Sequence, residues 1–263
     1  MPDMPKAVRG LWLAVALATA WLTAPAMAEV DAGKLPAAQA AATKFVTLAK
    51  GSETTAAVPR ESDAETRQLL DTVFDLSDVG AGKTITAADL GPLGQRMMTG
   101  IKVGLVYLLA GTGVTDLAQL GGDQKAADKL NVNAAKFQPE VGRLYDFQMR
   151  IQAAIIESAL ARMAAATPEE QARPNFQGGL AKMREGAAQS VRGVIETLSV
   201  NGITDPWRRD RFPALVVIAP KLARFLLPEQ KTDLQKLALE SARTLTDPQV
   251  KQGLQGFANV VVK

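Results

Sequence analysis

The stretch PEVGRLYDFQMRIQAAIIESALARMAAA, residues 139–166, decides the fold that the sequence predicts. Its apolar residues recur every three or four positions and form two stripes. One stripe contains Val141, Leu144, Ile151 and Ile155, and the other contains Tyr145, Met149, Ile156, Leu160 and Met163. A helix with two apolar stripes is buried on more than one side. We therefore predict a long central helix from about Pro139 to Ala166.

Charged residues occupy the remaining face of this helix. Arg143, Asp146, Arg150 and Glu157 stand at spacings that permit ion pairs between positions three and four apart. Such pairs contribute a few tenths of a kcal/mol each when they are exposed. We expect this face to be solvated.

The rest of the chain also has apolar spacing of three and four residues, with no sustained alternation, and this predicts an all-α protein. Proline and glycine mark the ends of an irregular bundle of about eight helices. The expected helices cover residues 36–50, 64–79, 86–109 with an interruption near Gly91 and Pro92, a short one closed by Gly121–Asp123, 139–166, a turn with a capping box at Thr167–Glu170, 175–200 capped by Asn175, and three that begin near Pro206, Pro228 and Pro248.

The N-terminal residues have the pattern of a secretory signal peptide. A basic region with Lys6 and Arg9 precedes an apolar run, residues 11–22, and the small residues Ala26 and Ala28 follow. This order predicts cleavage before Glu29 and export to a bacterial periplasm. The apolar run is shorter than the about 20 residues that a spanning helix needs, so we expect no transmembrane segment in the mature chain.

Three regions follow from this pattern. Residues 1–28 are the expected signal peptide, residues 29–63 an N-terminal helix with a polar linker, and residues 64–263 a helical domain. Residues 1–28 hold two of the 30 basic and one of the 27 acidic residues, so their removal lowers the formal charge from +3 to +2. The remaining basic residues are scattered, and we expect no nucleic-acid partner.

The composition excludes many catalytic mechanisms. The chain has no histidine and no cysteine, so it cannot supply a Ser-His-Asp triad, a Cys-His dyad, a haem ligand or a His/Cys zinc site. No serine has a lysine three residues later. Asp71, Asp75 and Asp78 share one helix face, which we interpret as solvated and not as a metal site. We expect no cofactor and no metal, and we assign no catalytic residue.

The stretch TDPWRRDRFPALVVIAPKLARFLLP, residues 204–228, is the candidate binding region. Its apolar spacing predicts a core helix that Pro220 kinks and whose centre, at Val216 and Val217, is apolar on all sides. The expected exposed entrance and the first core residue are Trp207, Arg208, Arg209, Arg211 and Phe212. Large amphipathic rings and guanidinium groups are typical of binding hot spots. The alternative is that these arginines pair with acids of a neighbouring helix.

Three glycines are spaced seven residues apart along the helix expected at 175–200: Gly179, Gly186 and Gly193. Glycine inside a helix costs up to about 1 kcal/mol relative to alanine. A row of three therefore predicts close approach by a neighbouring helix or, alternatively, by a ligand.

The segment PLGQRMM, residues 92–98, resembles a recurring signature in a family of exported bacterial helical domains of unknown function. The resemblance covers only these residues. It implies no activity.

Three classes of function remain open. The first is a non-enzymatic periplasmic protein that binds another macromolecule through its helices. The alternative is a carrier of a lipid or another apolar small molecule in a bundle cavity, for which the apolar segments 103–109 and 214–219 are the candidates. The third is a carboxylate-dependent hydrolase, which needs two facing acids with raised pKa values in a cleft.

Overall fold

The computed structural model describes residues 34–79, 84–115 and 124–263, and every regular element in these ranges is a helix. The prediction of an all-α bundle is confirmed. The elements are α2 (Lys34–Leu48), α3 (Ser52–Thr55), α4 (Ala64–Val73), the 3-10 helix η2 (Ala87–Asp89), α5 (Leu90–Leu108), α6 (Gln124–Lys136), α7 (Gln138–Ala165), α8 (Pro168–Gln171), α9 (Pro174–Leu198), α10 (Asp205–Asp210), α11 (Phe212–Phe225), α12 (Pro228–Thr244) and α13 (Pro248–Val261).

Two predictions fall on residues outside the described ranges. The signal peptide with its cleavage site at Ala26, Ala28 and Glu29 is one of them. The helix end at Gly121–Asp123 is the other. Both stay predictions.

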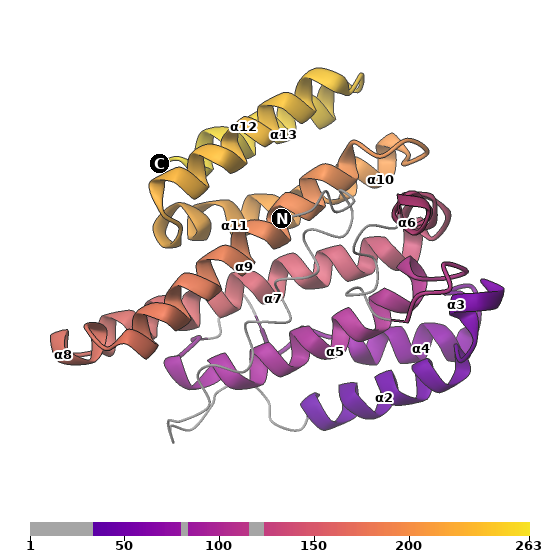
Figure 1. Cartoon of the computed structure of the whole chain (residues 1–263), viewed down its shortest axis with the longest axis horizontal. Coiled ribbons are helices and arrows are strands. Elements are labelled where there is room, and N and C mark those ends of the chain that lie inside the picture. The colour runs from indigo at the N-terminus through magenta and orange to yellow at the C-terminus, as the bar shows by residue number, and fades with distance from the viewer. Residues whose placement is uncertain (1–33, 80–83, 116–123) are drawn as a thin grey trace.

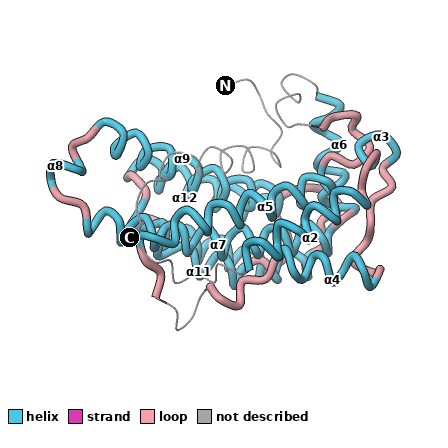
Figure 2. The backbone as a smooth tube through the Cα atoms, turned by 90° about the horizontal axis from the view of Figure 1, so that it is seen from below, coloured by secondary structure: helices cyan, strands magenta, loops and turns pink. Residues whose placement is uncertain are grey.

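Helix α7 runs through the middle of the molecule (Figure 1). Helix α5 packs on one side of it, and α9 and α11 pack on the other. Helices α2 and α4 lie against each other, and α2 also packs on α5. At the opposite edge, α12 and α13 cover α9 and α11. The second view shows the same long helices running lengthwise along an extended bundle (Figure 2).

The central position of α7 is confirmed, and its charged face is partly solvated, but the expected ion pairs along this face are replaced by pairs with other elements. Arg143 donates to Glu61 Oε1 at 2.8 Å, Asp146 accepts from Arg211, and Glu157 pairs with Lys221. These three side chains keep 25–42% of their surface exposed, and their charges are paired across elements and not along α7. Only Arg150 is exposed as expected.

Several helix ends differ from the prediction. Helix α4 ends at Val73, so Asp75 and Asp78 lie in the turn that follows it. Helix α5 continues without interruption through Gly91 and Pro92, because a proline in the first turn removes no intrahelical hydrogen bond. Pro174, and not Asn175, begins α9. Helix α6 was not predicted as a separate helix.

Other local predictions are confirmed. Thr167 and Glu170 form a capping box with reciprocal hydrogen bonds. Asp247 caps α13 through Val250 N, and Pro248 is its first residue. The core stripe of α9 is buried throughout, and it comprises Phe176, Leu180, Met183, Ala187, Val191, Val194 and Leu198.

Helix α11 also differs from its prediction. Its core face is buried at Leu215, Ile218 and Leu222, but Val216 is 63% and Val217 50% exposed, so the helix is not buried on all sides. The helix continues through Pro220, which is exposed, so the backbone group that proline leaves unpaired can be solvated. Within the described ranges, no helix combines the length and apolarity needed to cross a membrane.

The polar linker before α4 is fixed to the bundle. Gly111 N donates to Ser52 O at 2.8 Å, and Tyr107 Oη donates to Pro59 O at 3.0 Å. Helix α2 belongs to the same core, since Phe45 is fully buried with its ring centroid 5.6 Å from that of Tyr107. The linker therefore connects parts of one packed structure.

Candidate functional site

Trp207, the aromatic residue of the candidate binding region, lies inside the protein. It is 7% exposed, and its Nε1 donates to Gln138 O at 2.6 Å. Its ring meets Tyr145 of α7 edge-on, with centroids 6.1 Å apart. The ring therefore attaches α10 to the start of α7.

Arg211 is buried beside Trp207 and not exposed as expected. Its Nη1 donates to Asp146 Oδ2 at 2.6 Å and to Gly142 O, and its guanidinium carbon lies 5.1 Å from the Trp207 ring centroid. Burial lowers the pKa of Arg211, and Asp146 opposes this effect. Arg211 therefore pairs with an acid of a neighbouring helix, which was the alternative interpretation of the sequence.

Arg208 also uses its guanidinium for hydrogen bonds within the protein. It donates to Leu198 O at 2.7 Å, Val200 O at 3.2 Å and Asp205 Oδ1 at 2.6 Å. Leu198 is the last residue of α9, so no further helical turn can satisfy its carbonyl, and Val200 lies two residues beyond it. Arg208 thus caps α9 from α10.

The other two predicted residues, Phe212 and Arg209, differ in their exposure. Phe212 is half-buried, and its ring fills the space beside Gly253 of α13, where a Cβ atom would approach it to 2.6 Å. Arg209 is exposed and donates to Gln249 Oε1 at 2.9 Å. A binding role for this region stays a prediction, with Arg209 as the one accessible guanidinium of the three predicted arginines.

Gly179, Gly186 and Gly193 are all buried on α9. Helix α9 packs against α12 and α7. The burial agrees with the predicted close approach, which itself stays a prediction. Glycine contacts that the sequence reasoning missed occur elsewhere: a Cβ on Gly100 of α5 would lie 2.3 Å from Phe147, and one on Gly104 would lie 2.2 Å from Leu144.

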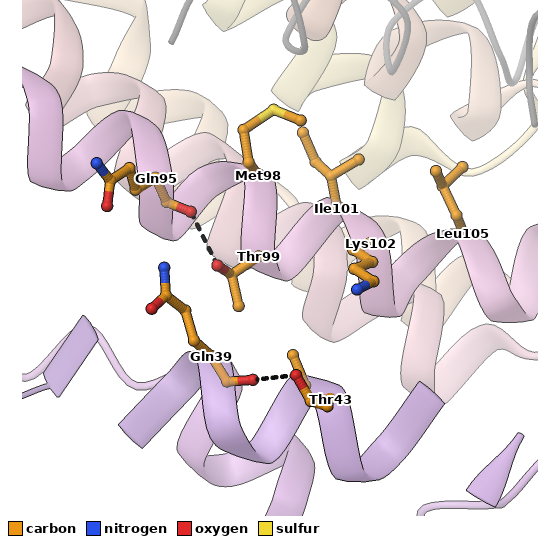
Figure 3. Close-up of a pocket in the computed structure, with 9 residues that line it drawn as sticks. Gln39, Thr43, Gln95, Met98, Thr99, Ile101, Lys102 and Leu105 are labelled. Atoms are coloured by element: carbon orange, nitrogen blue, oxygen red, sulfur yellow. Dashed lines mark hydrogen bonds between the residues drawn. The ribbon is translucent and has the colours of Figure 1, made fainter. Parts of the chain in front are cut away.

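A groove of about 620 Å³ lies between α2 and α5 (Figure 3). Its lining comprises Gln39, Ala42 and Thr43 of α2 and Gln95, Met98, Thr99, Ile101, Lys102 and Leu105 of α5. The α5 residues form two rows at helical spacing. Met98, Ile101 and Leu105 make an apolar row, and Gln95, Thr99 and Lys102 make a polar row that faces α2 (Figure 3).

The polar row offers little charge to a ligand. Thr99 Oγ1 donates to Gln95 O, and Thr43 Oγ1 donates to Gln39 O, each at 2.9 Å, so both hydroxyl protons are used within their own helices. Lys102 is exposed and makes no ion pair with any acid in the described part of the chain. The groove therefore presents a largely uncharged surface with one available cation.

A second, more polar pocket of about 450 Å³ lies between the turn after α4 and α7. It contains two acids, Asp75 and Asp146. Burial raises the pKa of Asp146, and Arg211 and Arg150 lower it in part. Burial also acts to raise the pKa of Asp75, but hydrogen bonds from Lys34 and Ser77 outweigh it and lower that pKa to about 2. Only one acid of this pair has the raised pKa that a hydrolase of the predicted kind needs.

The three aspartates that share a face in the sequence are held separately. Asp71 pairs with Arg143, Asp75 with Lys34 and Asp78 with Arg96. The solvated interpretation is wrong for Asp78, which is 8% exposed. Among the described residues, no group of three or more acids is placed to hold a metal ion.

The groove itself was not predicted, although Leu105 lies in the apolar segment 103–109 considered for a carrier, and Gln95 and Met98 lie in the segment 92–98. The available signal was the polar row Gln95, Thr99 and Lys102, at positions i, i+4 and i+7 of a helix that is otherwise apolar except for Arg96. No family model matches the chain, and no curated protein or solved structure matches it. The geometry of the groove is therefore the basis for a functional proposal.

Proposed function

We propose that this protein is a non-enzymatic binding protein that holds a helical segment of a partner protein in the groove between α2 and α5. The observation that carries the proposal is the pair of parallel rows on α5, one apolar and one polar, beside α2. An amphipathic helix lying along α5 would place its apolar face on Met98 and Leu105, which are half-buried, while Ile101 between them is 1% exposed and belongs to the core.

The shape of the groove supports a rod-like ligand. Its α5 lining extends from Gln95 to Leu105, which corresponds to about 15 Å at 1.5 Å per residue. The groove is open to solvent along this length, so a rod-like ligand can enter it from the side. A partner helix needs only one face covered, and an open groove of this length provides that.

The chemistry of the lining points in the same direction. Interface cores are depleted in charged residues, and eight of the nine lining residues are uncharged. Met98 can adapt its side chain to different partner surfaces. The exposed Lys102 favours a partner helix with an acidic residue at the edge of its apolar face.

A carrier function has less support. Residues 103 and 107–109, in the first apolar segment proposed for a carrier, are buried in the core. The enclosed space beside Leu90, Met163 and Met183 measures about 10 Å³, which is room for at most one water molecule. This enclosed space is too small for a lipid.

Site-specific photo-crosslinking tests the proposal. A benzophenone amino acid at position 99 should crosslink to one partner protein, and Thr43→Arg on the facing helix should abolish that product. Thr232→Arg is the matched control, because Thr232 is also an exposed helical threonine that donates to the carbonyl four residues earlier. Crosslinks to lipid alone, or protein products that Thr43→Arg leaves unchanged, would refute the proposal.

We also propose that the protein acts in a bacterial periplasm after cleavage before Glu29. The order of the basic, apolar and small-residue regions in residues 1–28 supports this location. N-terminal sequencing of the protein from the periplasmic fraction should give Glu29 as the first residue. A chain in that fraction that still begins at Met1 would contradict the cleavage.

A further inference from the structure

The polar pocket between α4 and α7 has features that its ion pairs do not explain. It is lined by Phe74, Asp75, Leu76 and Ser77 of the turn after α4 and by Arg143, Asp146, Phe147 and Arg150 of α7. The four α7 residues stand at i, i+3, i+4 and i+7 and share one helix face. The pocket is separate from the α2–α5 groove, since the two have no lining residue in common.

Two aromatic rings form an apolar wall of this pocket. Phe74 and Phe147 have ring centroids 5.2 Å apart, tilted by 53°. Phe147 is 2% exposed and packs closely over Gly100 of α5, so its ring has little freedom to move. Leu76 extends the apolar lining.

Most charges of the pocket are already neutralised by described residues. Arg143 is bound by Glu61 and Asp71. Asp75 accepts from Lys34 Nζ at 2.7 Å and from Ser77 N at 2.8 Å. These groups hold the pocket together and have little capacity left for a ligand.

Arg150 and Asp146 retain that capacity. Arg150 is exposed, and its side chain makes no ion pair or hydrogen bond with another residue in the described ranges. Asp146 uses Oδ2 for Arg211, and no described residue donates to its Oδ1. The two residues lie four positions apart on α7, where side chains are neighbours. Arg150 can therefore donate to an anion while Asp146 Oδ1 accepts from a donor beside it.

We propose that this pocket binds a free α-amino acid with an apolar side chain. The carboxylate accepts from the Arg150 guanidinium, the ammonium group donates to Asp146 Oδ1, and the side chain packs against Phe74, Leu76 and Phe147. A zwitterion is the smallest ligand class that offers an anion and a cationic donor side by side. The volume of about 450 Å³ lies within the usual range for small-molecule sites, roughly 300–1,000 Å³.

Calorimetric titration with L-phenylalanine and L-leucine tests this proposal, with 3-phenylpropionate and 2-phenylethylamine as probes that lack one charged group each. At least one amino acid should bind, and each single-charge probe should bind at least about tenfold more weakly than L-phenylalanine. Arg150→Gln should weaken amino-acid binding about tenfold and leave the melting temperature nearly unchanged, because Arg150 makes no hydrogen bond or ion pair with a described residue and only a longer-range charge interaction with Asp146. Arg224→Gln, at an exposed arginine of α11 outside the pocket, is the matched control and should bind like the wild type.

Three outcomes would overturn the proposal. The first is the absence of binding for both amino acids at millimolar concentration. The second is equal binding by the Arg150→Gln variant. The third is equal binding of 3-phenylpropionate and L-phenylalanine, which would show that Asp146 accepts nothing from the ligand. All three are independent of the partner helix proposed for the α2–α5 groove.

Discussion

The two sides of α7 are held to their neighbours by different kinds of contact. Toward α5, the glycines Gly100 and Gly104 leave space that Phe147 and Leu144 fill. Toward α10 and α11, Gly142 of α7 leaves space for Trp207 and Arg211, whose polar atoms then bind the backbone of α7 and Asp146. The α5 side is thus an apolar fit, in which side chains of α7 pack against glycines of α5. The side toward α10 and α11 is a polar tie, in which hydrogen bonds and an ion pair form across a close approach to Gly142.

This difference determines which substitutions each side tolerates. An apolar fit is sensitive to added volume, because the filled space cannot expand without moving packed side chains. A polar tie is sensitive to the loss of one partner, because the remaining buried group is then left without compensation. Substitutions of packed glycines and of paired charged residues separate these two sensitivities.

The largest effect is expected at the buried ion pair between α5 and the turn after α4. Arg96 is 2% exposed and donates to both carboxylate oxygens of Asp78, at 2.8 and 2.7 Å. Arg96→Met should lower the free energy of unfolding by about 3–5 kcal/mol, because among the described residues Asp78 then keeps only Lys34, at 3.9 Å. Denaturant unfolding monitored by circular dichroism measures the loss.

The double variant Arg96→Met/Asp78→Asn sharpens this test. It should recover part of the lost stability, since the cost of the single change comes mainly from the uncompensated charge of Asp78. A double variant that is less stable than Arg96→Met would show that the contact depends on packing and not on charge.

The same contrast explains what the sequence could predict. The core stripes of α7 and α9 depend on local spacing, and they were predicted because neighbouring residues fix which face of a helix is apolar. The pair of Arg211 and Asp146 joins residues 65 positions apart, and no local rule selects one acid among many as the partner. Trp207 was misplaced for the same reason, since the gap it fills is at Gly142 of another helix.

The groove between α2 and α5 could not be predicted from the sequence for a related reason. The groove depends on how α2 lies beside α5, and the facing threonines Thr43 and Thr99 are more than 50 positions apart. The end of α4 at Val73 also moved Asp75 out of a helix and into a pocket. Periodicity predicts which side chains are buried, but the relative placement of helices determines which exposed side chains meet.

On the apolar side of α7, Gly100→Ala should destabilise the protein by about 1–3 kcal/mol, although alanine has the higher helix propensity. The added methyl group would meet the Phe147 ring, which is held between Phe74 and α5. Gly256→Ala in α13 is the matched control, because a Cβ there meets nothing within 4 Å. That control should raise the melting temperature, and equal effects at the two glycines would refute the close fit.

Gly186 tests whether α9 has the same kind of apolar fit. Gly186→Leu should cost about 1–3 kcal/mol through overpacking if a neighbouring helix contacts this buried position closely. Thermal unfolding gives the answer directly. An increase in melting temperature would show that the row of glycines on α9 leaves open space.

A smaller effect is expected where Arg208 caps α9. Arg208→Ala should cost about 1–2 kcal/mol, because the carbonyls of Leu198 and Val200 lose a charged donor. Arg209→Ala changes the next residue and removes one exposed contact to Gln249, so it should stay within about 0.5 kcal/mol of the wild type. If Arg209→Ala instead reduces partner retention without changing stability, the predicted contact surface on α10 is supported at this residue.

The smallest predicted effect is the pH dependence that Asp75 contributes. Hydrogen bonds from Lys34 and Ser77 lower its pKa from 3.8 in the unfolded chain to about 2 in the folded one. The ionised form is therefore favoured by folding, and its contribution is complete above about pH 4 and disappears as the pH falls toward 2. The Asp75 side chain is 38% exposed, so solvent screening leaves this contribution below about 1 kcal/mol. We expect the difference in unfolding free energy between the wild type and Asp75→Asn to shrink between pH 5 and pH 2. A difference that stays constant over this range would mean that Lys34 holds the turn through the packing of its side chain. The charge of Asp75 would then contribute nothing to the contact between α2 and that turn.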